Sequence, residues 1–94
     1  MSEDKLEKSV LKEICDLLDS IAESETKEAA AQHISLANFK CNNIRIHLTG
    51  YTAEKLAYAF NAAKEASGKV KDKQRKLDIY NSEKYKFTRC ISVI

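Results

Sequence analysis

The sequence contains five cysteine and histidine side chains that could ligate zinc or act as a nucleophile or base: Cys15, Cys41, Cys90, His33 and His47. Zinc sites usually contain paired ligands a few residues apart, because one turn or hairpin then presents both to the metal. None of the five lies in such a pair, and no Gly-x-Ser-x-Gly or Cys–His motif marks an activated nucleophile. We therefore expect a protein that is not an enzyme and that binds no metal or cofactor.

The cysteines also indicate the cellular compartment of the protein. Three cysteines at wide spacing do not indicate a disulfide framework, and free thiols are typical of a reducing compartment. No apolar run approaches the roughly 20 residues that cross a membrane, and the charged N-terminus lacks the apolar core of a signal peptide. We expect a cytoplasmic protein with no membrane partner.

Charge is divided unequally along the chain. Residues 1–39 hold four basic and nine acidic side chains, a net of −5, whereas residues 40–94 hold twelve basic and five acidic, a net of +7. Such asymmetry suggests a polyanionic partner, or one half of the molecule facing the other. If the partner is RNA or DNA, lysines and arginines would contact phosphates and nearby tyrosines could stack on bases. The candidate nucleic-acid-binding residues are Arg45, Lys69, Lys71, Lys73, Arg75, Lys76, Lys84, Lys86 and Arg89.

The N-terminal elements are predicted to be helical. Apolar residues recur at spacings of three and four from about Glu3 to Glu23, with Ser2 as a possible N-cap, which indicates an amphipathic helix. A second, alanine-rich helix is predicted from about Thr26 to Cys41, ending at Asn42-Asn43. A single long helix over residues 3–40 is the alternative. The apolar stripe of the first helix exceeds what a small sheet covers, so its protein-interface candidates are Val10, Ile14, Leu17 and Ile21.

The hydrophobic period changes after Asn43. Apolar and polar residues alternate from Ile44 to Thr49, which predicts a strand, and Thr52 and Gly68 delimit a helix over 53–67. A polar loop follows at 69–76. A short strand begins at Leu77, a turn is predicted at 81–84, and a final strand runs from Tyr85 to Val93.

Together these elements predict one α+β domain over residues 1–94. Residues 1–41 form an acidic helical segment, and residues 42–94 form a basic β-α-β-β segment. We expect the helices to cover one face of a three-stranded sheet, since this arrangement buries every apolar face at this chain length.

Segments of the C-terminal half resemble the start of the ribosomal S-ten family. They are Ile44–Thr49, the helix ending in Ala63-Lys64-Glu65, the stretch Lys69–Lys71, and Tyr85–Thr88. The proline-containing loop that the family has after the position of Lys71 is absent, and the first 40 residues have no counterpart. The resemblance implies a basic RNA-binding protein.

Three functions are consistent with these features. The first is a small non-enzymatic interaction protein, a homo-oligomer or regulatory subunit that uses its N-terminal helices to contact protein. The alternative is an RNA- or DNA-binding module that uses the basic C-terminal loop and strands. A further alternative is a small inhibitor of a nucleic-acid enzyme, with the acidic helix as its active surface.

Overall fold

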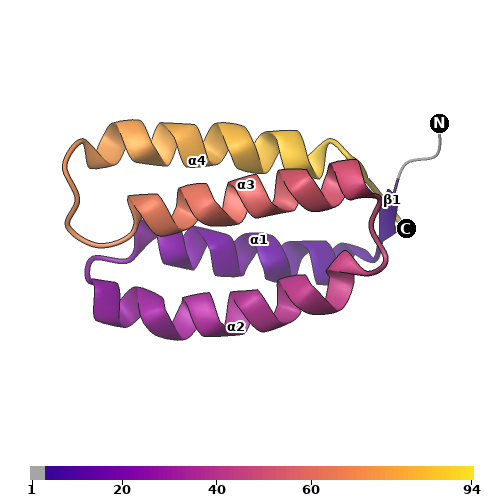
Figure 1. The fold of residues 1–94 in the computed structure, drawn as a ribbon, viewed down its shortest axis with the longest axis horizontal. Helices are drawn as coiled ribbons and strands as arrows, with labels where there is room; N and C mark the ends of the chain where they lie inside the picture. The colour runs from indigo at the N-terminus through magenta and orange to yellow at the C-terminus, as the bar shows by residue number, and fades with distance from the viewer. Residues whose placement is uncertain (1–3) are drawn as a thin grey trace.

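Residues 4–94 are described by the computed structural model, and four helices account for most of them. The helices run alternately in opposite directions, and the two short strands lie together at one end of the bundle (Figure 1). In chain order the elements are β1 (Asp4–Leu6), α1 (Lys8–Glu23), α2 (Lys27–Arg45), α3 (Gly50–Ala66), α4 (Lys73–Thr88) and β2 (Ile91–Val93). The protein is therefore a four-helix bundle with a two-stranded sheet, and the expected α+β architecture is wrong.

The first two helices are separate, which excludes the single long helix. Thr26 has extended backbone angles, φ −132° and ψ 156°, so the helical hydrogen-bond pattern is interrupted there. Its side-chain oxygen accepts a hydrogen bond from the Ala29 amide at 3.0 Å, which caps the start of α2. α2 then continues through Asn42 and Asn43 to Arg45, so the predicted stop at the two asparagines is also wrong.

The centre of the bundle is the contact between the parallel helices α1 and α3. α3 buries four alanines, Ala59, Ala62, Ala63 and Ala66, and small side chains allow two helix axes to approach closely. α1 supplies the larger side chains of the same core, Ile14, Leu18 and Ile21. Tyr80 and Phe87 of α4 complete this core from one side.

The predicted three-stranded sheet is absent from the described residues, which form only one pair of parallel strands. Asp4 lies opposite Ile91 and Leu6 opposite Val93, and the Ile94 amide donates to the Leu6 carbonyl at 3.0 Å. β1 replaces the predicted first turn of helix, so α1 begins at Lys8 and not near Glu3. The predicted cap at Ser2 lies outside the described residues.

The carboxylate of Asp4 ties β1 to the start of α3. It accepts hydrogen bonds from the Thr49 amide, at 3.1 and 3.2 Å, and from the Thr49 hydroxyl at 3.0 Å. Hydrogen bonding by Thr52 and Thr49 lowers the pKa of Asp4, and a negative charge is favourable at the N-terminal end of a helix. The N-cap of α3 is Thr49 and not Thr52, although Gly68, at φ +78°, follows the end of this helix as expected.

The strand predicted over Ile44–Thr49 is wrong because the alternating pattern also contains a helical spacing. Ile44 and Leu48, four residues apart, both pack against the core, whereas Ile46 is 79 % exposed. A strand would have placed all three on one face. Ile44 and Arg45 instead form the last turn of α2, and residues 46–49 connect it to α3.

The two strands predicted after Leu77 are wrong for the same reason. Tyr80 and Phe87 are buried seven residues apart on one face of α4, and Leu77 packs beside them. Residues 81–84, expected as a turn, lie inside this helix, and only the segment Ile91–Val93 is extended. The stretch Lys69–Lys76, expected as a loop, is irregular up to Asp72 and then begins α4.

Enlarging a buried alanine of α3 should destabilise the bundle. Ala63 is fully buried in the core, so Ala63→Leu forces α3 away from its neighbours, and we expect the unfolding free energy to fall by about 1–3 kcal/mol in urea titrations. Ala57→Leu, on the exposed side of the same helix, is the matched control and should change stability by less than about 0.5 kcal/mol. Equal effects at both positions would show that the core around Ala63 is loosely packed.

Candidate protein-interaction surface

The structure places most of the predicted α1 interface inside the bundle. Ile14 and Ile21 are almost completely buried in the core, and Val10 and Leu17 are partly buried against it. Of the four, Leu17 also lines a groove between α1 and α2. A surface on the N-terminal helices must therefore be built around Leu17 and whatever α2 places beside it.

α2 presents large apolar side chains to the outside. It buries mainly small residues, Ala30, Ala37 and Cys41, whereas Leu36 is 46 % exposed and Phe39 is 61 % exposed. Spacings of three, four and seven place these two on one side of the helix together with uncharged polar residues. We call this surface the α2 face and define it as Gln32, Ser35, Leu36, Phe39 and Asn43, all of which are exposed.

Four of the five residues of the α2 face lie in a segment that contains no Asp, Glu, Lys or Arg. Residues 29–39 contain no Asp, Glu, Lys or Arg, although these types make up 32 % of the chain. Sequence reasoning treated Leu36 and Phe39 only as bulk for the second helix. The absence of charge over eleven residues was the signal that could have drawn attention to them.

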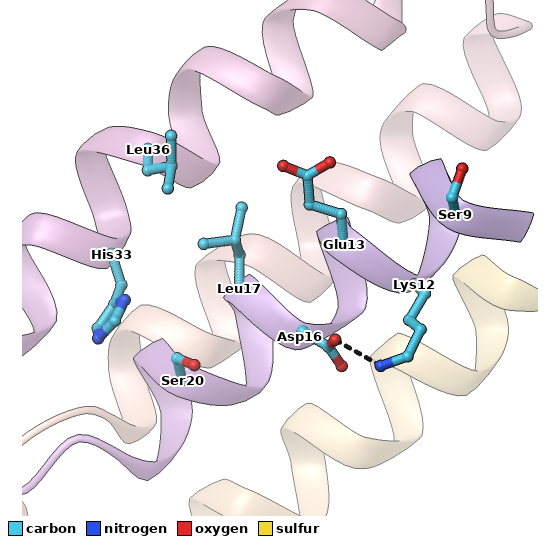
Figure 2. Close-up of a pocket in the computed structure, with 8 residues that line it drawn as sticks. All are labelled: Ser9, Lys12, Glu13, Asp16, Leu17, Ser20, His33 and Leu36. Carbon is cyan, nitrogen blue, oxygen red and sulfur yellow. Dashed lines mark hydrogen bonds and ion pairs between the residues drawn. The ribbon is translucent and has the colours of Figure 1, made fainter.

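A shallow groove of about 520 Å³ adjoins the α2 face. In Figure 2 Leu17 extends from α1 into the space between the helices, while Leu36 and His33 project from α2. Charged groups at its edge are neutralised: Lys12 pairs with Asp16 at 2.8 Å, and Lys40 pairs with Glu13 at 2.8 Å. The groove and the α2 face therefore form one surface whose centre is apolar and uncharged.

Three of the nine candidate nucleic-acid-binding residues donate to carboxylates or backbone carbonyls within the protein. The Lys73 ammonium donates to the carbonyl oxygens of Ser24, Ala66 and Gly68 at 2.8–2.9 Å. Lys84 pairs with Asp19 at 2.8 Å, and Lys86 pairs with Glu83 at 3.3 Å.

The remaining six candidates lie at opposite ends of the bundle. Arg45 is the last residue of α2 and Arg89 follows the end of α4, near the two strands (Figure 1). The other four lie around the α3–α4 connection at the far end: Lys69, Lys71, Arg75 and Lys76. The structure does not bring the nine residues together on one surface.

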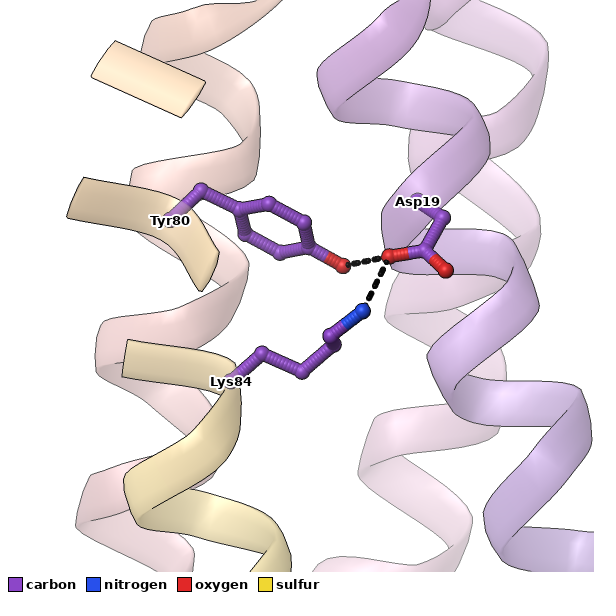
Figure 3. A network of polar contacts seen from close by, with 3 residues as sticks. All are labelled: Asp19, Tyr80 and Lys84. Atoms are coloured by element: carbon purple, nitrogen blue, oxygen red, sulfur yellow. Dashed lines mark hydrogen bonds and ion pairs between the residues drawn. The ribbon is translucent and has the colours of Figure 1, made fainter. Parts of the chain in front are cut away.

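The tyrosines are similarly divided. Tyr80 is 2 % exposed and donates its hydroxyl to Asp19 Oδ1 at 2.5 Å, beside the Lys84 ammonium (Figure 3). Burial and the Asp19 carboxylate raise the pKa of Tyr80 well above its ordinary value. Tyr51, Tyr58 and Tyr85 are exposed, and Lys55 lies over both of the first two rings.

The side chains that could act in catalysis or bind a metal do not form a site. Burial raises the pKa of the Cys41 thiol to about 11, and burial also raises that of Cys15, so neither is an activated nucleophile. Between residues 4 and 94, no three His, Cys, Asp or Glu side chains converge on a possible metal position. Over the same residues, no helix has the length and apolar character needed to cross a membrane.

Comparisons of the chain with protein-family models, with curated proteins and with solved structures found no match. The resemblance to the ribosomal S-ten family is not supported, because Tyr85–Thr88 is helical and Ile44–Thr49 is the end of a helix and a connection. A proposal about function therefore rests on the α2 face and the adjoining groove.

Removing the buried Tyr80 hydroxyl should destabilise the protein in a pH-dependent way. We expect Tyr80→Phe to lower the unfolding free energy by about 1–2 kcal/mol at pH 7, because Asp19 loses one of its two hydrogen-bond donors. A tyrosine whose pKa is raised in the folded state contributes its full stabilisation of the fold at any pH below its pKa in the unfolded state, which is about 10. This contribution is lost as the pH rises above that value. The difference between wild type and Tyr80→Phe should therefore shrink above pH 10 in denaturant titrations. Tyr85→Phe, at an exposed ring, is the control, and a pH-independent difference at Tyr80 would contradict the assignment.

Lys73 should matter for stability more than the basic residues around it. Its ammonium satisfies carbonyl groups at the ends of α1 and α3, where cations are favourable. We expect Lys73→Met to lower the unfolding free energy by about 2 kcal/mol in thermal or urea unfolding. Lys76→Met changes the same charge one turn later and should have a much smaller effect. Similar losses for the two variants would show that net charge, and not carbonyl binding, is responsible.

Proposed function

We propose that the protein is a non-enzymatic interaction protein that binds another protein chain through the α2 face and the adjoining groove. The observation that carries the proposal is the exposure of Phe39 and Leu36 within a segment free of charged side chains. Cores of protein–protein interfaces are distinguished by depletion of charged residues and enrichment in aromatic ones. Covering these side chains also removes apolar surface from water, which stabilises a complex by roughly 25 cal/mol per Å² of apolar surface buried.

The chemistry of the surface describes its partner. Leu36 and Phe39 require apolar side chains opposite them, whereas the polar groups around them require hydrogen-bond partners or water. These polar groups are the amides of Gln32 and Asn43 and the hydroxyl of Ser35. Phe39, as the most exposed aromatic side chain of the surface, is the expected anchor of the interface. A partner with an uncharged apolar stripe fits this description better than a polyanion.

The other two functions have less support. For RNA or DNA binding, the candidate cations are divided between two ends of the bundle. For the acidic inhibitor, Glu13, Asp16 and Asp19 of α1 are each paired with a lysine, so much of the acidic surface is already neutralised.

Substitutions on the α2 face should remove binding while leaving the fold intact. A tagged chain, expressed in its own cells together with an untagged copy, should retain specific protein partners, and Leu36→Lys should lose them. Ile79→Lys is the matched control, since Ile79 is 45 % exposed on α4 and gains the same charge. Phe39→Ala should weaken the recovered interaction at least about tenfold, equivalent to about 1.4 kcal/mol.

Circular dichroism should show the same helix content in all variants. Partners retained by Leu36→Lys, or lost equally from Ile79→Lys, would contradict the proposal.

A further inference from the structure

Two helices end beside each other where the α1–α2 and α3–α4 connections lie, at the end of the bundle away from the strands (Figure 1). α1 ends at Glu23 and α3 at Ala66, and the Gly68 amide donates to the Ser24 carbonyl at 2.8 Å across the two ends. The last carbonyl groups of a helix have no partner inside it and carry the negative end of its dipole. A positive charge is therefore favourable between these two helix ends.

The Lys73 ammonium lies between the two ends. It donates to the carbonyl oxygens of Ser24, Ala66 and Gly68 at 2.8–2.9 Å, so each of its three N–H groups has an acceptor. None of these acceptors is a carboxylate, and Lys73 forms no ion pair with any residue between 4 and 94. The cation is thus held by backbone carbonyl groups, which in some ion sites replace the water around the ion.

The position of Lys73 in its own helix indicates that the charge serves the other helices. Lys73 is the first residue of α4, and a positive charge at the start of a helix opposes the dipole of that helix. Its side chain carries the charge to the ends of α1 and α3, where the dipoles favour it. The requirement for a cation therefore comes from the carbonyl groups of α1 and α3.

Contacts that do not involve the ammonium hold these carbonyl groups in place. Besides the hydrogen bond from Gly68 to Ser24, the Ser67 hydroxyl, which is buried, donates to the Lys64 carbonyl at 2.6 Å. The Lys27 ammonium donates to the same hydroxyl at 3.1 Å. The Lys27 side chain also packs against Gly68, since a Cβ added there would lie 3.2–3.3 Å from its carbons. We therefore expect the carbonyl groups to keep their arrangement when the ammonium is removed.

We infer that the ends of α1 and α3 form a binding site for an ammonium ion, which the chain fills with its own Lys73 side chain. Three convergent carbonyl oxygens match the three N–H donors of a primary ammonium group. A guanidinium presents its donors in a flat fork and does not match them. Protein sites for Ca²⁺ and Mg²⁺ contain carboxylates, and the three acceptors here are all neutral. An external ammonium ion should therefore occupy the site once the Lys73 side chain is shortened.

Replacing Lys73 by side chains of two sizes tests the site. Lys73→Ala removes the ammonium and leaves room for an ion, whereas Lys73→Met removes the charge but still fills most of the space. Urea unfolding is followed by circular dichroism in ammonium chloride and in tetramethylammonium chloride, which has no N–H donor, at the same ionic strength. Because an ion that binds only the folded state stabilises it, ammonium should lower the unfolding constant of Lys73→Ala at least about threefold more than that of the wild type. Lys73→Met and the control Lys76→Ala should respond as the wild type does.

The comparison stays informative if Lys73→Ala is partly unfolded without ammonium, because circular dichroism then follows its refolding as ammonium is added. A response of Lys73→Ala no larger than that of the wild type overturns the inference. An equal response of Lys73→Met also overturns it, since ammonium would then act without entering the site.

The wild-type chain allows a second measurement. Three acceptors hold the Lys73 ammonium, so in NMR spectra its protons should exchange with water more slowly than those of Lys76. Slow exchange at Lys73 supports an occupied site, and equal rates at the two lysines would contradict it.

Discussion

The close contact between α1 and α3 determines how the rest of the bundle is arranged. α3 buries four alanines and contacts both α1 and α4, so the two parallel helices α1 and α3 take the centre, and α2 and α4 lie on their flanks. The α2 residues that are fully buried are small, Ala30, Ala37 and Cys41, and Ile34 and Ile44 are partly buried against the core. Leu36 and Phe39 remain outside. The surface that we propose as an interface is thus a consequence of how the core is built.

Part of the charge division of the sequence is resolved inside the fold. Glu13 and Asp19 of the acidic helix pair with Lys40 and Lys84 on α2 and α4, so opposite charges meet across helix contacts. Lys73 performs a similar task at the end of the bundle, where α1 and α3 both terminate and their exposed carbonyl groups concentrate negative potential. Placing a cation there satisfies two helix ends with one side chain. Part of the asymmetry that suggested a polyanionic partner therefore holds helices together.

The sequence predicted the parts of the fold that depend on local patterns. The apolar stripe of the first helix and the stop at Gly68 were visible because spacing and backbone freedom are local properties. α4 was missed because Tyr85–Val93 alternates like a strand, and the decisive partner of Tyr80, Asp19, lies 61 residues away. For the candidate surface, the charge-free segment at residues 29–39 was readable. The side chains of this segment that point outward are determined by where α1 packs against α2. No local sequence pattern predicts that position.

The pairing of β1 with β2 has a consequence for the order of folding. Asp4 meets Ile91 across 87 positions, so the two strands join only after almost all of this sequence is available, and the entropy of closing so long a loop opposes them. The helical hairpins, whose contacts are short-range, can form much earlier. β1 is then the last element to be secured and the first to detach. Its amides should exchange with solvent through a local opening that leaves the four helices assembled.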